Sequence, residues 1–174
     1  MNNERILINK LKSFENINSN LINILLALFG TFLLAISSKV QVPFWPVPMT
    51  MQTFVIFLIG MTYGIRLSFA TVALYLFEGA AGLPVFASGG GIAYLIGPTA
   101  GYLYGMLFAS VVISYLANLG FSKTYFKATF SLLIGSVIIF LIGITYLGSI
   151  IGYQKAIAAG LVPFIPSELF KIAL

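Results

Sequence analysis

The sequence contains no cysteine, no histidine and no aspartate, and only 7% of its 174 residues are charged. Without cysteine, the chain can form neither a disulfide bond nor a thiolate nucleophile. Intramembrane proteases of the known plans need paired aspartates, a serine with a histidine, or metal-binding histidines, and none of these sets exists here. The usual metal ligands are missing as well. We therefore expect a protein that is not an enzyme and that holds no metal.

Hydrophobic residues make up 60% of the chain, and the mean hydropathy is +1.05. Soluble domains carry about 25% charged residues, so this composition predicts an integral membrane protein. The apolar runs do not alternate as the strands of a membrane β-barrel do over about 10 residues. At about 20 residues per span, the length allows one all-α domain of five or six helices.

Six apolar segments suggest how the chain is divided. The expected spans are Leu21 to Ser38, Met51 to Gly64, Leu67 to Gly82, Pro98 to Leu119, Phe130 to Ile151 and a last helix that begins at Ser167. Residues 1–20 form a polar arm, either solvated in the cytoplasm or folded as a short interfacial helix, and residues 21–174 form one transmembrane substrate-binding domain. At a rise of about 1.5 Å per residue, the last segment cannot cross a core of about 30 Å. We expect an incomplete sixth helix or a native chain that continues.

Basic residues predict the orientation in the cell membrane. Six lie on the first side of the alternating spans: Arg5, Lys10, Lys12, Arg66, Lys123 and Lys127. Only Lys39 and Lys155 lie on the second side, so the positive-inside rule puts the N-terminus in the cytoplasm. This topology explains the net charge of +5 better than nucleic-acid binding does. Three irregular loops, Gln41 to Thr50, Gly82 to Gly97 and Gly152 to Pro166, would then face outward and could form a binding site.

Small residues recur at helical spacing in two of the spans. Gly97, Gly101, Gly105 and Ala109 form a ridge without large side chains, and the first span has a stripe of Ala27, Thr31 and Ala35. In lipid, such surfaces let helices approach closely. The ridge predicts a closely packed neighbour. The stripe is compatible with a partner protein and with packing inside this chain.

Few polar side chains lie at membrane depth, where ionisable groups are candidates for function. Glu168 and Lys171 are three residues apart and should share a helix face. Alternatively, Glu168 complements the helix dipole and Lys171 only pairs with it. Gln52 begins the second span. Glu78, near the end of the third, either takes part in the site or neutralises a lysine at the water interface.

Aromatic and glycine residues of the loops are further candidates for a site that binds a small, partly apolar ligand. Trp45, next to Phe44 in a proline-rich loop, is compatible with a stacking wall or lid and with the aromatic belt of the membrane surface. Phe86, Tyr94 and Tyr102 are either an apolar wall or ordinary packing. Gly89, Gly90 and Gly91 allow close approach of backbone to a ligand. No GK[ST] follows them, so they do not form a nucleotide-phosphate loop.

Four ordered motifs together resemble the BioY family, the biotin-specific substrate-binding (S) components of energy-coupling-factor (ECF) transporters. They are VPFWPVPMTMQTF at Val42 to Phe54, GLPVFASGGG at Gly82 to Gly91, GPTAGYLYG at Gly97 to Gly105 and PFIPSELFK at Pro163 to Lys171. The resemblance implies a bundle of six transmembrane helices with biotin bound near the extracellular face and no cofactor. It also implies association with a transmembrane coupling protein and two cytoplasmic ATPases, the coupling protein facing the stripe of Ala27, Thr31 and Ala35.

The resemblance also implies roles for the candidate residues. The ureido ring of biotin has two N–H donors and one carbonyl acceptor, which Glu168 and Lys171 or Gln52 could satisfy. Phe86, Tyr94 and Trp45 suit its apolar ring and tail. The biotin carboxylate could bind the backbone at Gly89 to Gly91 or Lys171.

The last motif departs from the family pattern, which usually has Gly-Asp where this chain has Ser167-Glu168. The carboxylate is thus one methylene longer than is usual. Two alternatives stay open at this point: an S component for a different vitamin, and a membrane scaffold or enzyme that transports nothing.

Overall fold

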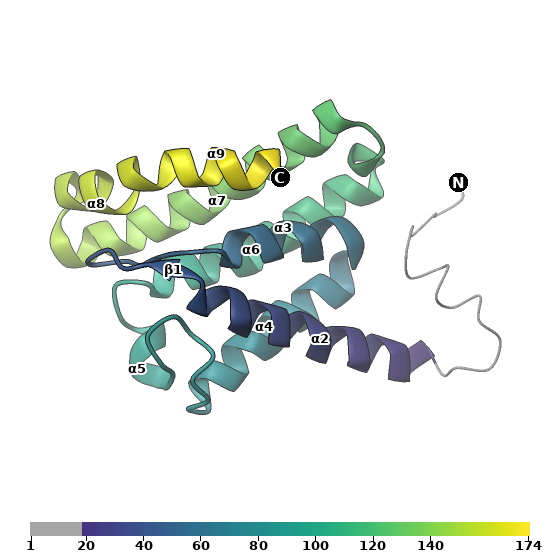
Figure 1. The fold of residues 1–174 in the computed structure, drawn as a ribbon, viewed down its shortest axis with the longest axis horizontal. Coiled ribbons are helices and arrows are strands. Elements are labelled where there is room, and N and C mark those ends of the chain that lie inside the picture. The colour runs from purple at the N-terminus through teal and green to yellow at the C-terminus, as the bar shows by residue number, and fades with distance from the viewer. Residues whose placement is uncertain (1–18) are drawn as a thin grey trace.

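The structure, a computed structural model, describes residues 19–174 and is mostly helical (Figure 1). The predicted N-terminal arm therefore lies outside the described residues, except for its last two positions. The helices are α2 (Ser19–Lys39), α3 (Gln52–Thr62), α4 (Ile65–Ala80), α5 (Ile92–Leu95), α6 (Ala100–Asn118), η1 (Phe121–Lys123), α7 (Tyr125–Ile151), α8 (Tyr153–Gly160), η2 (Val162–Phe164) and α9 (Ile165–Ala173).

Four segments of the described chain are long and apolar enough to cross a membrane. They are α2, α6, α7 and the stretch Tyr153–Ala173, which contains α8, η2 and α9. Helix α3 is apolar but has only 11 residues. The prediction of a helical, membrane-embedded protein agrees with this composition and length.

The loop after α2 contains a small hairpin. Strands β1 (Gln41–Val42) and β2 (Met49–Thr50) are antiparallel, with Gln41 opposite Thr50 and Val42 opposite Met49. Three prolines lie between the strands, and proline has no N–H for a strand ladder. The hairpin therefore stays short, and the chain continues from it into α3.

Several predicted boundaries are wrong, among them the start of the last helix, which is Ile165 and not Ser167. Helix α6 begins at Ala100 rather than at Pro98, which lies in a turn where the Ala100 N–H donates to Gly97. Helix α7 begins at Tyr125, not Phe130. The stretch expected as a loop after α7 is mostly helical, because α8 is rich in alanine, a strong helix former. Gly152 separates α7 from α8 with a φ of 88°, which other residues rarely adopt.

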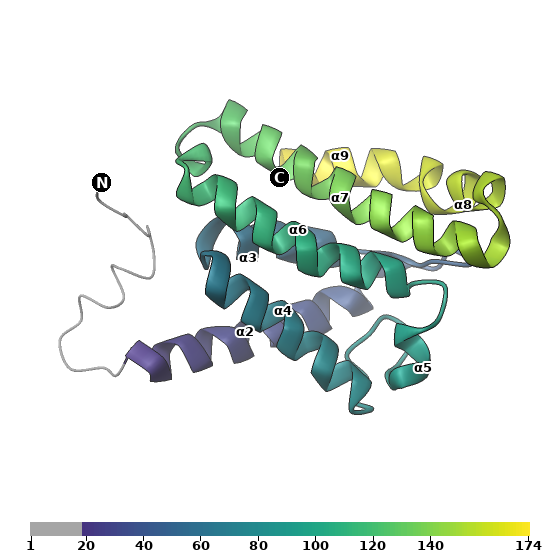
Figure 2. The ribbon, with the colours of Figure 1, turned by 180° about the vertical axis from the view of Figure 1, so that it is seen from behind.

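The glycine ridge packs α6 against α7, and the two helices lie side by side in both ribbon views (Figure 2). A Cβ added to Gly105 would lie 2.8 Å from the Cα of Ile139, and Gly101 faces Tyr146 in the same way. In return, Gly143 of α7 makes room for the ring of Tyr102. The predicted close neighbour is therefore α7.

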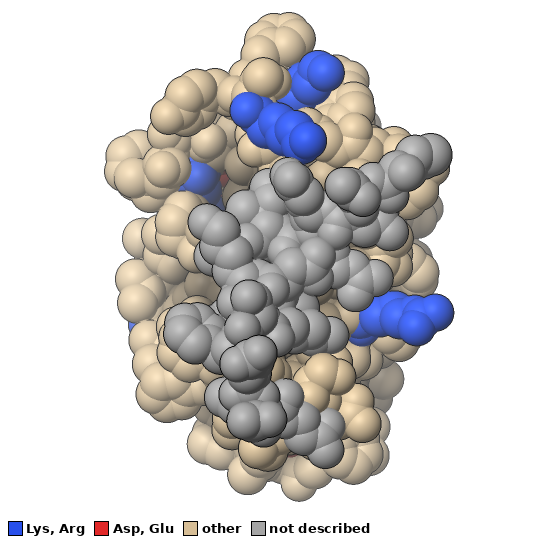
Figure 3. All heavy atoms as spheres, turned by 90° about the vertical axis from the view of Figure 1, so that its right-hand side faces the viewer, with Lys and Arg blue, Asp and Glu red and all other residues tan. Residues whose placement is uncertain are grey.

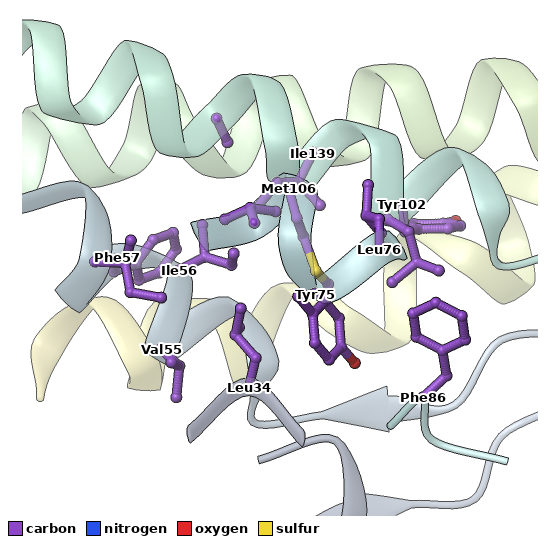
Figure 4. Close-up of a cluster of buried hydrophobic side chains, with 14 of the residues drawn as sticks. Leu34, Val55, Ile56, Phe57, Tyr75, Leu76, Phe86, Tyr102, Met106 and Ile139 are labelled. Carbon is purple, nitrogen blue, oxygen red and sulfur yellow. The ribbon is translucent and has the colours of Figure 1, made fainter. Parts of the chain in front are cut away.

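A core of buried apolar side chains fills the space between α2, α3, α4, α6 and α7 (Figure 4). Leu34 of α2 and Ile56 of α3 are almost completely buried, as is Ile139 of α7. Tyr75 and Phe86 close this core toward the hairpin, with their rings edge to face at a centroid distance of 5.4 Å. This packing fixes the backbone on which the polar residues described below are placed.

The small-residue stripe of α2 faces the interior of the bundle. Ala27 and Thr31 are 8% and 4% exposed, and Ala35 is half-buried. Between them Gly30 lies against Thr71 of α4. This placement favours packing within the chain. A partner interface through the stripe stays a prediction, to which Ala27 and Thr31 offer almost no exposed surface.

Lys and Arg side chains are visible at the end of the bundle where α2 starts (Figure 3). Arg66 is in the first turn of α4, Lys123 in η1 and Lys127 in the first turn of α7. The hairpin lies toward the opposite end of α2 (Figure 1). The bundle therefore has a basic end and, away from it, an end built from the hairpin and loops.

Candidate binding site

Polar side chains from α3, α7 and α9 meet inside the bundle. The Lys171 ammonium donates to Glu168 Oε1 at 2.6 Å and to Thr53 Oγ1 at 2.9 Å. The Thr53 hydroxyl donates to the same Glu168 oxygen at 2.6 Å. Ser136 donates to the other oxygen, Oε2, at 3.4 Å. We call Thr53, Glu168 and Lys171 the charged wall.

Both charged groups of this wall are buried, with Glu168 4% and Lys171 3% exposed. An isolated ion in a protein interior costs several kcal/mol, so each charge depends on the other and on the hydrogen bonds around the pair. Pro166 lies in the first turn of α9, where its missing N–H is not needed, and starts the helix that carries both residues. The prediction that Glu168 and Lys171 share a helix face is confirmed by their ion pair.

A cavity lies beside the charged wall. It is enclosed by Val47, Pro48, Thr50, Gln52, Thr53, Ala87, Tyr94, Thr99, Tyr102, Leu103, Met106, Ile139, Phe140, Phe164, Glu168 and Lys171. These residues come from the hairpin, from α3, α5, α6, α7, η2 and α9, and from the loops that flank α5. The space open to the centre of a water molecule is about 40 Å³. The cavity is thus narrow, with polar groups concentrated on α3 and α9.

Aromatic side chains form part of the cavity lining. The rings of Tyr102 and Phe164 are nearly parallel at a centroid distance of 6.5 Å, and Phe140 meets Phe164 edge to face at 6.0 Å. The Tyr102 hydroxyl is turned away to donate to the Gly160 carbonyl at 3.0 Å. A partly apolar ligand would therefore meet aromatic rings as well as the polar groups of α3 and α9.

A second polar cluster extends from the cavity toward α4. The Gln52 amide donates to the Tyr75 hydroxyl at 2.7 Å and accepts from Thr50 Oγ1 at 3.1 Å. The Tyr75 hydroxyl donates to the Val85 carbonyl at 2.8 Å. We call Thr50, Gln52 and Tyr75 the neutral wall, because none of its groups is charged.

The structure brings five of the predicted site residues together around the cavity: Gln52, Tyr94, Tyr102, Glu168 and Lys171. Phe86 is fully buried behind Tyr94, on which it stacks at 4.8 Å, and does not line the cavity. Their roles toward a ligand stay predictions.

Other predicted residues lie elsewhere. The Trp45 side chain is 84% exposed. Gly89, Gly90 and Gly91 lie outside the cavity lining, and a Cβ on Gly90 would meet the Leu83 carbonyl. Glu78 is half-buried and, within residues 19–174, forms no ion pair with Lys39 or Lys155. Lys39 instead donates to the Phe86 carbonyl at 2.6 Å.

Sequence reasoning missed Thr53, Phe164 and Phe140. The first two lie inside the motifs Val42 to Phe54 and Pro163 to Lys171, next to residues that were singled out, so the motifs contained a signal for them. Phe140 gave none, because α7 is apolar around most of its circumference.

Comparison with known proteins identifies the family to which the chain belongs. The model of the BioY family matches residues 9–174. The chain belongs to the BioY family. A "Probable biotin transporter BioY" from Rickettsia prowazekii is 35% identical over 168 residues, 96% of this chain and 86% of the relative. The "Biotin transporter BioY" of Thermotoga maritima is 37% identical over 146 residues, 83% of this chain and 85% of the relative.

A solved structure has the same fold as this BioY-family chain. It is described as the S-component for biotin from an ECF-type ABC transporter, and it superposes with a TM-score of 0.79 at 26% identity. The match covers 90% of this chain and 88% of the other. The resemblance stated from the four motifs is thus confirmed at the level of family and fold.

Proposed function

We propose that this chain is the S component of an ECF-type transporter and binds biotin in the cavity beside the charged wall. One observation carries the proposal: in a chain of this family, the same cavity is lined by a buried carboxylate–ammonium pair and by several aromatic rings. Ionisable groups inside a membrane protein are functional candidates because they are expensive to bury. We take biotin as the ligand because the relatives are named biotin transporters.

The chemistry of biotin matches the two polar walls. A lysine ammonium has three N–H donors, and Lys171 uses two of them on Glu168 and Thr53. The third is free for the ureido carbonyl. Glu168 Oε2, which among residues 19–174 accepts only the long bond from Ser136, and Gln52 Oε1 are acceptors for the two ureido N–H groups. The thiophane ring then packs against Phe164 and Tyr102.

Binding requires the cavity to widen, because about 40 Å³ has room for only a few water molecules and not for a bicyclic ligand. Val47 and Pro48 of the hairpin form one side of the cavity. The hairpin has two short strands, and the loop between them carries the exposed Trp45. We infer that the hairpin moves outward to admit the ligand and packs on it afterwards.

Active transport requires partners or another energy source, since the sequence contains no ATP-binding motif. We infer six spans, with α3 and α4 as short spans beside α2, α6, α7 and the stretch from α8 to α9. The basic end faces the cytoplasm with the N-terminus, and the hairpin faces outward. A transmembrane coupling protein and two cytoplasmic ATPases would supply the energy, while this chain acts as the binding protein and not as an enzyme.

The test is the ligand that the protein carries and responds to. The full chain, purified in detergent, is expected to release biotin on denaturation, detected by mass spectrometry, and added biotin is expected to raise its midpoint of thermal unfolding. A different vitamin in the mass spectrum would favour an S component for that vitamin. Finding no ligand, together with no thermal response to biotin, would contradict the proposal and favour a scaffold.

A further inference from the structure

Tyr75 is the member of the neutral wall that lies behind the cavity lining, and no sequence pattern marks it. Its side chain is 1% exposed, and its ring is packed against Phe86. In Figure 4 its hydroxyl oxygen points away from Met106 and Ile139, out of the apolar cluster. A buried hydroxyl needs hydrogen-bond partners, and the partners of Tyr75 determine how the Gln52 amide is oriented at the cavity.

The hydroxyl of Tyr75 fixes which end of the Gln52 amide faces it. A tyrosine hydroxyl has one hydrogen, and this hydrogen is donated to the Val85 carbonyl at 2.8 Å, which can only accept. The hydroxyl must therefore accept from Gln52, so the NH₂ group of the amide faces Tyr75 at 2.7 Å. The amide oxygen is then at the opposite end, where Thr50 donates to it.

We propose that Tyr75 is a positioning residue for ligand binding: it orients the Gln52 amide so that the amide oxygen is offered to a ligand N–H. This inference rests on the proposed function, because the ligand N–H is that of a ureido ring. Gln52 is 4% exposed and lines the cavity, and its oxygen has a second lone pair beyond the one used by Thr50. An amide turned the other way would offer N–H groups and repel the ligand donor.

The Val85 carbonyl, which accepts from Tyr75, belongs to a loop whose backbone is held by hydrogen bonds. Ser38 of α2 lies within hydrogen-bond distance of it at 2.8 Å, and the next two carbonyls, of Phe86 and Ala87, accept from Lys39 at 2.6 Å and from Gln41 at 3.3 Å. Consecutive carbonyls of the loop are thus held by the end of α2 and by β1. Tyr75 connects this held backbone to Gln52, which lines the cavity.

The experiment is a double-mutant cycle on biotin binding, measured by calorimetry on the purified full chain. Tyr75→Phe and Gln52→Met are each expected to weaken binding about threefold, the effect of one neutral hydrogen bond. Because Tyr75 acts through Gln52, the double variant is expected to bind no more weakly than Gln52→Met alone. Tyr63→Phe is the matched control, since it removes a comparable bond to the Leu26 carbonyl, and it should leave the affinity unchanged.

Several results would overturn the inference. One is unchanged affinity of Tyr75→Phe, and another is a double variant whose loss equals the product of the two single losses. If Tyr75→Phe does not fold, Gln52→Met alone decides, and wild-type affinity of that variant contradicts the proposal. Absence of biotin binding by the wild type would instead refute the proposed function together with this inference.

Discussion

The two polar walls of the cavity are built differently. The charged wall is formed by contacts across the sequence, since the Thr53–Glu168 hydrogen bond joins residues 115 positions apart, and its members share one carboxylate oxygen. The neutral wall is closer in sequence, because Thr50 ends β2, Gln52 begins α3, and Tyr75 lies 23 positions from Gln52. Each of its hydrogen bonds joins uncharged groups.

This difference predicts unequal responses to mutation. Removing one member of a buried ion pair leaves an uncompensated charge, whereas removing one neutral hydrogen bond costs about 1 kcal/mol. Substitutions in the charged wall should therefore weaken ligand binding more than substitutions in the neutral wall. Three substitutions test this order, from the largest expected effect to the smallest.

Lys171→Ala is expected to have the largest effect. It removes the ligand donor and leaves Glu168 buried without its cation, so biotin binding should weaken by on the order of 2 kcal/mol, or about 30-fold. Calorimetric titration measures this loss. Lys155→Ala, an exposed lysine of α8, is the control and should bind as the wild type does. Unchanged affinity of Lys171→Ala would remove Lys171 from the site.

Thr53→Val is expected to have an intermediate effect on the same wall. Valine keeps the shape of threonine but neither donates to Glu168 nor accepts from Lys171, so affinity should fall by about 1 kcal/mol, or about fivefold. Thr62→Val on the same helix is the control, because its exposed hydroxyl only bonds the Leu58 carbonyl. A loss as large as that of Lys171→Ala would mean that the ion pair cannot hold its geometry without Thr53.

Gln41→Ala is expected to have the smallest effect. Its amide is exposed and makes one long bond, 3.3 Å, to the Ala87 carbonyl behind the neutral wall. We expect a loss below about 0.5 kcal/mol, less than threefold in the dissociation constant. Equilibrium binding of radiolabelled biotin resolves such a change. A loss exceeding that of Thr53→Val would mean that the loop behind the neutral wall contributes more to binding than the charged wall does.

Much of the helical arrangement could be predicted because spans need long apolar runs, and α2, α3, α4, α6 and α7 all lie within or close to the expected segments. The glycine ridge also predicted a close contact between two helices, because glycine has no side chain that would keep the neighbouring helix away. Helix α8 was missed because Gly152 and the later prolines look like a loop, although the alanines between them favour a helix.

The candidate site was only partly predictable, for a physical reason. Ionisable residues are so rare in this chain that Glu168 and Lys171 were conspicuous. Whether an aromatic ring in a loop points inward is decided by tertiary packing, so Trp45 and Tyr94 could not be distinguished from the sequence. Thr53 and Tyr75 gave no signal of their own, because their importance comes from partners on other helices.

The central claim is that this chain binds biotin in the cavity, and a titration of biotin into the purified full chain tests it most directly. Calorimetry on the detergent-solubilised wild type, from which bound ligand has been exchanged out, should show one saturable site for biotin. An equal concentration of thiamine should give no saturable heat and should not compete with biotin. Binding of thiamine instead, or no saturable heat with biotin, would contradict the account.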